Sequence, residues 1–161
     1  MSSPTARLAE LGLSLPPVPK ALAAYLPAVR SGELIFTAGQ LPLSDGQLIA
    51  TGKVPTDVSE DEAGAAARQA ALNGLAAAAE VAGGLDRIAQ VVKVVVYVAG
   101  TTDFTAQPAV ANGASELLGE VFGDAGLHAR SAVGVAVLPL NAPVEVELVV
   151  RVAAEPRVRP A

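Results

Sequence analysis

The chain has 161 residues, a formal net charge of −5 and a sequence pI near 4.8; 52% of its residues are hydrophobic, mainly Ala, Val and Leu, and 3% are aromatic. This length accommodates one domain with one core, and the acidic balance is opposite to the one needed to hold the phosphates of a nucleic acid, so we expect no nucleic-acid partner. The lack of cysteine excludes disulfides and a thiolate nucleophile, and no run of about 18 apolar residues predicts a membrane span.

The two ends of the chain differ in pattern from its middle. Residues 1–20 are proline-rich and weakly patterned, so we expect a loosely packed N-terminal arm there. The arm lacks the basic start and the uninterrupted apolar stretch of a secretory signal, which favours a cytoplasmic protein. We expect the domain over residues 21–154 and a loose tail over residues 155–161.

Strands are expected at the start of the domain. GELIFTAG, residues 32–39, has the β-branched and aromatic content of a strand and follows a Ser31-Gly32 turn. Residues 23–30 are expected to pair with it as a hairpin, at a sheet edge because Pro27 lacks an amide hydrogen. Asp45-Gly46 is a strong turn signal and predicts a short third strand.

The hydrophobic period changes at Ser59. Ser59 and Glu62 have the spacing of a capping box, in which each side chain accepts a hydrogen bond from the other residue's free amide. A long alanine-rich helix is therefore predicted from here to about Ala82, ended by Gly83-Gly84. Its small side chains would let it lie close against a sheet.

The second half of the chain alternates strands with one more helix. QVVKVVVYVAG, residues 90–100, is predicted to be a central strand because it is β-branched almost throughout. A second helix is expected from about Gln107 to Val121, with Pro108 in its first turn. The last two strands are expected at residues 130–139 and 143–152.

This order of elements predicts an α+β fold with one mixed sheet and both helices on one face. In the last strand, Val144 and Val146 face one side of the sheet, whereas Glu145 and Glu147 face the other. Because the valine-rich strands offer apolar residues to both faces, we expect the face without helices to be buried by another subunit.

Arg130 stands at the head of an otherwise apolar strand. A guanidinium stays charged at physiological pH and presents a planar fork that matches a carboxylate. Arg130 is therefore either an anion receptor at the start of a strand or one half of a surface salt bridge, and the spacing of residues leaves both alternatives open.

Other polar residues are weaker candidates. Glu145 and Glu147 lie roughly 7 Å apart on one strand face, where they either position a water or decorate an exposed surface. Tyr25, beside loops, is a better candidate for a ligand-facing hydroxyl than Tyr97, which lies in a strand expected to be buried. His128 is a candidate general base or a structural hydrogen-bonding residue.

Motifs for other chemistries are missing from the sequence. Ser131 has no visible His-Asp partner set and no GxSxG motif surrounds it. The glycine spacings do not form a phosphate loop, and there is no clustered acidic loop for a cation. We therefore expect no metal and no cofactor.

Several blocks, in order over about residues 20–153, together carry a family resemblance. They are Tyr25, ELIFTAGQLP, VVKVVVYV with a following Asp103-Phe104, Asn112, ARSAVGVAVLP and VEVE. The chain resembles the RidA/YjgF family of reactive-intermediate (enamine/imine) deaminases, members of which are also known as L-PSP endoribonucleases or translation initiation inhibitors.

The resemblance implies a chorismate-mutase-like α+β fold assembled as a homotrimer, with the sheets facing a central core and clefts between subunits. It implies that Arg130, the arginine of the ARS block, clamps the carboxylate of a substrate. It also implies that Glu145 helps to position water, that Tyr25 lines the cleft, and that Gly39 and Asn112 border it.

Some positions depart from the common family pattern. Ala38 stands where many members have Ser or Thr before the Gly-Gln pair, and Ala132 replaces a frequent Cys. The segment between Phe104 and Arg130 is longer than in the shortest members, which places His128 beside the cleft as a further substrate-binding candidate. The carboxylate clamp is retained, whereas the identity of the substrate is left open.

Three functions follow from these observations. The first is hydrolysis of 2-enamine or 2-imino acids of the 2-aminoacrylate type to 2-keto acids and ammonia, with a small 2-imino or 2-keto acid as the ligand. The second is RNA cleavage or translation inhibition. The acidic balance, the few aromatic residues and the single histidine argue against this function. The third is a non-catalytic trimer that binds small carboxylates, which Ala38 and Ala132 favour.

Overall fold

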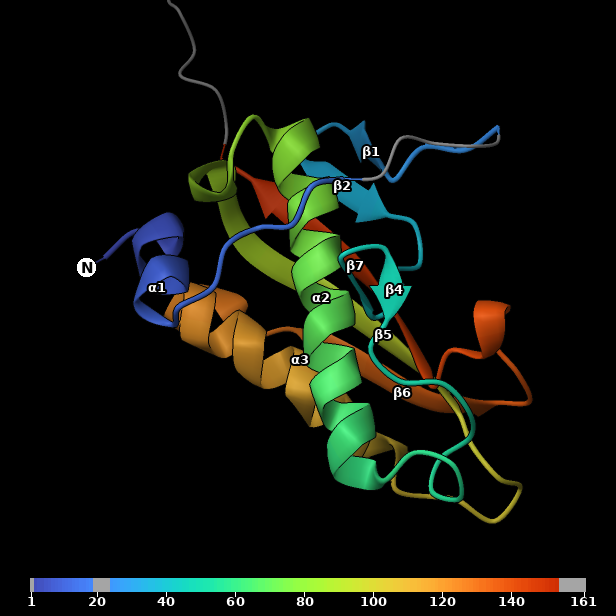
Figure 1. Ribbon diagram of the computed structural model, residues 1–161. Helices are drawn as coiled ribbons and strands as arrows, with labels where there is room; N and C mark the ends of the chain where they lie inside the picture. The colour runs from blue at the N-terminus through green and yellow to red at the C-terminus, as the bar shows by residue number, and fades with distance from the viewer. Residues whose placement is uncertain (1, 19–23, 154–161) are drawn as a thin grey trace, which may run out of the picture.

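The computed structural model describes residues 2–18 and 24–153, so the predicted tail at 155–161 and the end of the predicted arm, residues 19–20, lie outside the described residues (Figure 1). The helical elements are α1 (Pro4–Glu10), α2 (Glu60–Ala82), η1 (Leu85–Arg87), α3 (Gln107–Phe122), η2 (Gly123–Gly126) and η3 (Pro139–Asn141). The strands are β1 (Ala28–Ser31), β2 (Leu34–Thr37), β3 (Leu43–Ser44), β4 (Gln47–Leu48), β5 (Ile88–Ala99), β6 (Ala129–Val135) and β7 (Val144–Val152). Among these residues, no helix combines the length and the apolar character that crossing a membrane requires.

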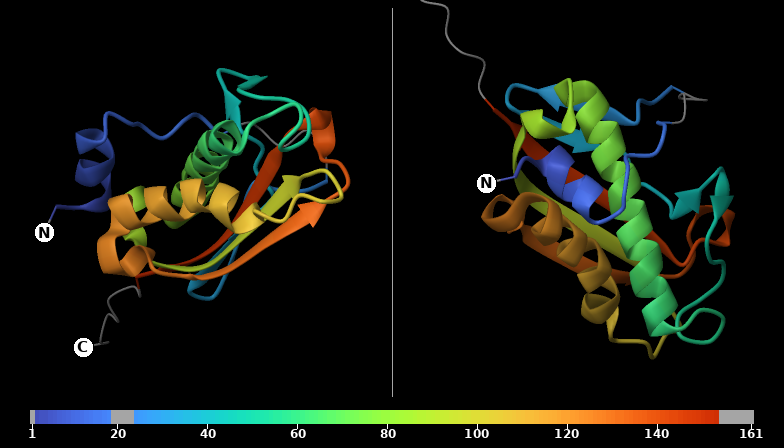
Figure 2. Two further views of the ribbon diagram at one scale, coloured as in Figure 1. Left: turned by 90° about the horizontal axis from the view of Figure 1, so that it is seen from below. Right: turned by 60° about the vertical axis from the view of Figure 1, so that its left-hand side comes forward.

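Five strands form one mixed sheet in the order β1-β2-β7-β5-β6. Neighbouring strands are antiparallel except β5 and β6, which run parallel because α3 connects them as a crossover. Helices α2 and α3 both lie on one side of this sheet (Figure 2). The structure therefore confirms the predicted α+β class and the placement of both long helices on one face.

Helix α2 forms as its sequence predicts. The Glu62 carboxylate accepts a hydrogen bond from the Ser59 amide at 2.8 Å, and the Ser59 hydroxyl accepts one from the Glu62 amide at 3.2 Å. The helix ends at Gly83, whose φ of 82° suits glycine. Most of the buried residues of α2 are alanines, whose small side chains let the helix lie close to the strands.

The contact between α2 and α3 is made by glycine backbones. A Cβ atom on Gly113 of α3 would collide with the carbonyl group of Gly64 of α2. Gly64, which costs α2 helix propensity, thus has a packing role, because it lets the two backbones touch. This contact sets where α3 lies relative to β6.

The N-terminal segment differs from its expectation. Residues 4–10 form α1, capped by Ser3 and held to the rest of the fold by a 2.8 Å hydrogen bond from the Thr5 amide to the Asp86 carboxylate. Leu8 of α1 is buried in the core. A helix this short gains its stability from docking, which sequence periodicity does not report. The predicted count of two helices is therefore too low within the described residues.

The predicted third strand also differs. Asp45 and Gly46 make the expected tight turn, with φ of 51° and 78°, but β3 and β4 pair with each other and not with the five-stranded sheet. The side-chain amides of Gln69 and Asn73 on α2 donate hydrogen bonds to the carbonyl of Leu43 and hold this hairpin against the helix.

On the sheet face opposite the helices, several apolar side chains are exposed in the isolated subunit. Val29, Phe36 and Val133 are 48%, 40% and 43% exposed, although they lie within strands. The expectation of a second apolar face is confirmed, while its burial by another subunit stays a prediction.

The helix contact yields a matched pair of substitutions on α3. Gly113→Ala is expected to lower the free energy of unfolding by about 1–3 kcal/mol, because the new methyl group has no space beside Gly64. Gly119→Ala, where no atom lies within 4 Å of the added Cβ, is expected to raise it by about 0.5–1 kcal/mol. Denaturant unfolding of both variants measures the difference, and equal effects would contradict the proposed close contact.

Candidate functional site

Arg130 lies on β6 with its side chain on the helix-covered face, since it is paired in register with the buried Val94 of β5. Its Nη1 group donates hydrogen bonds to Asn112 Oδ1 at 2.9 Å and to Ser115 Oγ at 3.2 Å, and Nη2 donates to the carbonyl of Pro108 at 3.3 Å. All three partners belong to α3, so this helix holds the guanidinium in place.

The partly buried guanidinium has no acidic partner among the described residues. Its three acceptors are neutral, and the salt bridge that these residues contain joins Arg68 to Glu120. Of its five N–H donors, the Nε hydrogen and one Nη2 hydrogen have no partner in the described part of the chain. These two donors sit on adjacent guanidinium nitrogens, an arrangement that fits a bidentate carboxylate. The structure thus does not show Arg130 as half of a salt bridge.

His128 is engaged at both ring nitrogens. Nδ1 lies 2.6 Å from the carbonyl oxygen of Gly126, and Nε2 lies 2.9 Å from Ser115 Oγ. Because a carbonyl oxygen can only accept, Nδ1 carries the hydrogen, and Nε2 of the neutral ring accepts the Ser115 hydroxyl hydrogen. Neither nitrogen is free to act as a base or to contact a ligand in this arrangement.

Glu145 lies on β7 and faces the other side of the sheet. Its carboxyl group rests on the backbone of Gly39, where a Cβ atom would collide with it. The neighbouring Tyr97 is paired with Glu145 in register and donates a 3.2 Å hydrogen bond to Glu147. The structure thus brings Gly39 and Glu145, two of the predicted site residues, together beside a second carboxylate.

The surroundings of Glu145 favour its neutral form. Burial raises the pKa of the Glu145 carboxyl above its usual value of 4.5, and the negative charge of Glu147 raises this pKa further. The pKa of Tyr97 is raised as well, first by burial and then by the charge of Glu147. Glu145 is therefore a better proton acceptor than an exposed glutamate.

The predicted site residues lie at three separate places in one chain. Arg130, Asn112 and His128 gather between α3 and β6, whereas Gly39 and Glu145 lie at β7 on the opposite face. Tyr25 is 61% exposed and lies just before β1, at the sheet edge opposite β6. A single chain does not bring the three positions together.

Ser115 is a functional candidate that the sequence analysis missed. It connects Arg130 to His128 through its hydroxyl oxygen. The signal that was available is its spacing: Ser115 follows Asn112 by three residues and so lies on the same side of the helix.

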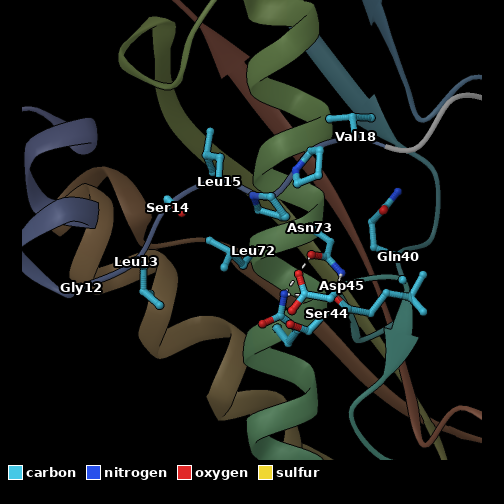
Figure 3. Close-up of a pocket in the computed structure, with 15 residues that line it drawn as sticks. Gly12, Leu13, Ser14, Leu15, Val18, Gln40, Ser44, Asp45, Leu72 and Asn73 are labelled. Carbon is cyan, nitrogen blue, oxygen red and sulfur yellow. Dashed lines mark hydrogen bonds between the residues drawn. The ribbon is translucent and has the colours of Figure 1, made fainter.

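A cavity of ≈ 520 Å³ lies elsewhere, between residues 12–18, α2 and the β3-β4 hairpin (Figure 3). The Asn73 amide at its wall donates to the carbonyls of Leu41 and Leu43, at 2.9 and 3.0 Å. None of the predicted site residues lines this cavity, and the side-chain amides of Gln69 and Asn73 at its wall attach the hairpin to α2.

Comparison with known proteins identifies the family. Residues 5–152 match the model of the family described as YjgF/chorismate mutase-like, putative endoribonuclease. The chain is 42% identical over 146 residues to Protein TCP17 of Trypanosoma cruzi, covering 90% of this chain and 91% of the relative. It is 34% identical over 131 residues to a 2-iminobutanoate/2-iminopropanoate deaminase of Escherichia coli (strain K12), covering 81% and 89%.

Solved structures agree with this assignment. A putative endoribonuclease from Shewanella oneidensis matches with a TM-score of 0.90 at 35% identity, covering 94% of this chain and 100% of that one. A protein of unknown function from Agrobacterium tumefaciens matches with a TM-score of 0.86 at 41% identity, covering 94% of both chains. The chain belongs to the YjgF/chorismate mutase-like family, which confirms the resemblance predicted from the sequence.

The raised pKa of Glu145 predicts a pH-dependent effect on stability. Since the folded-state pKa lies above the unfolded one, the folded state binds the proton more tightly, and stability falls as pH rises through this window. Glu145→Gln is therefore expected to stabilise the protein at pH 7, and the gain should vanish at pH values below the unfolded pKa of 4.5. Denaturant unfolding at several pH values measures this difference.

The matched control is Glu116→Gln, which removes a carboxylate from an exposed position of α3. An equal gain in stability at pH 7 from this control would mean that the effect of Glu145→Gln does not come from the surroundings of Glu145. A pH profile of Glu145→Gln parallel to that of the wild type would contradict the assigned burial of this carboxyl.

Proposed function

We propose that the chain is a hydrolase that converts small 2-imino acids, the tautomers of 2-enamines such as 2-aminoacrylate, to 2-keto acids and ammonia. The observation that carries this proposal is the partly buried guanidinium of Arg130, which has no acidic partner among the described residues and retains two N–H donors. The substrate class is supported by relatives 33% and 34% identical that are named 2-iminobutanoate/2-iminopropanoate deaminase. Such substrates carry a carboxylate next to the reacting carbon, which fits the free donors of Arg130.

The proposed mechanism depends mainly on positioning. Arg130 holds the carboxylate, and a water attacks the adjacent imine carbon, which is already electrophilic. Glu145 accepts a proton from this water and returns it to the nitrogen, which gives a carbinolamine. Transfer of the hydroxyl proton to the nitrogen then expels ammonia and leaves the 2-keto acid, so one water is consumed and the reaction needs no cofactor.

The proposed site lies between chains. Arg130 and Glu145 face opposite sides of the sheet, so one chain cannot present both to the same substrate. We therefore assign the cleft to a homo-oligomer, a homotrimer as the family resemblance implies, in which one subunit supplies Arg130 and its neighbour supplies Glu145. The exposed apolar side chains Val29, Phe36 and Val133 support an oligomer, because they leave the helix-free face uncovered.

The activity test uses 2-aminoacrylate generated from serine by a dehydratase. The wild-type protein is expected to accelerate the release of pyruvate, whereas Arg130→Ala should lose about a hundredfold or more in kcat/KM, because two charge-assisted hydrogen bonds are removed. Arg130→Lys should recover part of this loss, since it restores the charge without the planar fork. Arg68→Ala, which breaks only the exposed salt bridge to Glu120, is the matched control and should retain full activity.

The same protein preparations distinguish the alternative functions. Binding of 2-oxobutanoate by calorimetry without any acceleration of pyruvate release would indicate a non-catalytic carboxylate-binding protein. RNA cleavage that coelutes with the oligomer and is lost in Arg130→Ala would indicate an endoribonuclease, the activity after which the solved relatives from Shewanella oneidensis and Thermotoga maritima are named. Either result would replace the proposed deaminase.

Subunit mixing tests whether the site is shared. Arg130→Ala and Glu145→Ala are each expected to be nearly inactive, but refolding them together at equal concentrations should restore about a quarter of wild-type activity, because a randomly mixed cleft receives both native residues about once in four. Mixing Arg130→Ala with the double variant Arg130→Ala/Glu145→Ala is the control and should restore nothing. Absence of recovery in the first mixture would place both residues outside a common cleft.

A further inference from the structure

We infer that Ser115 and His128 are positioning residues, which act on the substrate through Arg130 by fixing the direction of its guanidinium. This inference rests on the proposed role of Arg130 as a carboxylate receptor, and it assigns a further role to Ser115 and His128. It replaces the expectation that His128 itself contacts the substrate.

With the His128 ring neutral, the hydrogen bonds that connect Gly126, His128, Ser115 and Arg130 have one direction at each step. The carbonyl of Gly126 can only accept, so it receives the Nδ1 hydrogen of His128 at 2.6 Å. In the neutral ring Nε2 can then only accept, so it receives the Ser115 hydroxyl hydrogen at 2.9 Å. With its hydrogen committed, Ser115 presents only lone pairs to Nη1 of Arg130, 3.2 Å away.

Both hydrogen-bond partners of His128 are fixed to α3. Ser115 belongs to α3, and Gly126 lies so close to the same helix that a Cβ atom on it would collide with the carbonyl of Leu118. His128 therefore accepts from a hydroxyl and donates to a carbonyl that are both fixed by backbone packing. It cannot turn without breaking a hydrogen bond in a partly buried place.

The consequence for Arg130 is a defined orientation. Ser115 and Asn112 accept the two hydrogens of Nη1, so this end of the guanidinium is turned toward α3. The Nε edge is thereby left pointing away from these acceptors, with the donors that a carboxylate needs. Without Ser115, one acceptor remains at Nη1, and the long side chain gains rotational freedom that ligand binding must remove.

The test measures calorimetric binding of 2-oxobutanoate together with kcat and KM in the pyruvate assay. Ser115→Ala is expected to weaken 2-oxobutanoate binding about fivefold, because Nη1 of Arg130 loses one of its two acceptors and the guanidinium is held less firmly. The change should appear in KM more than in kcat, and Ser115→Thr should recover most of it because it keeps the hydroxyl. His128→Ala should weaken binding as much as Ser115→Ala does. The amide oxygen of the glutamine in His128→Gln can accept from Ser115, so the affinity of this variant should lie between that of His128→Ala and that of the wild type.

A double-mutant cycle separates positioning from a direct contact. In the Arg130→Ala background, adding Ser115→Ala should weaken 2-oxobutanoate binding no further, because the residue through which Ser115 acts is gone. Additive losses would mean that Ser115 contacts the ligand itself. If Arg130→Ala weakens 2-oxobutanoate binding but Ser115→Ala does not, the inference is overturned while the role of Arg130 as carboxylate receptor stands. If Arg130→Ala binds 2-oxobutanoate as the wild type does, the carboxylate receptor and the inference are both overturned. Thermal unfolding of each variant identifies losses that come from misfolding.

Discussion

The backbone contact between Gly64 and Gly113 is the constraint on which the candidate site depends. Alanines on α2 let that helix lie close to the sheet, and the absence of side chains at these two glycines lets α3 lie directly against α2. Asn112 precedes Gly113 and Ser115 follows it by two residues, so the helix crossing also fixes the acceptors of Arg130. The geometry of the guanidinium is thus decided by the packing of two helices.

The sheet divides the proposed chemistry between its two faces. On the helix-covered face, neutral oxygens orient a cation and leave its charge without a counterion within the described residues. On the other face, burial and a neighbouring carboxylate raise the pKa of Glu145. One face is suited to binding an acid and the other to accepting a proton, and in the proposed oligomer a cleft between subunits joins these two properties.

Local signals in the sequence predicted most of the fold. The capping box at Ser59, the C-terminal glycine of α2 and the β-branched strands depend on neighbouring residues, and these expectations are confirmed. The docking of α1 and the separate pairing of the β3-β4 hairpin depend on distant contacts, which explains why they were missed. The partners of Arg130 also depend on tertiary structure: a serine inside a helix, such as Ser115, acquires a role only when β6 places an arginine beside it.

The helix-free face of the sheet combines Phe36, Val95 and Val149 with Lys93 and Glu147. A purely apolar surface would let a second chain slide over it, since dispersion and the hydrophobic effect have little directional preference. Here a shift by one residue would set a carboxylate or an ammonium group against hydrocarbon. A subunit that covered this surface, as predicted, would have to align its own side chains with these two charges, and misaligned docking would be costly.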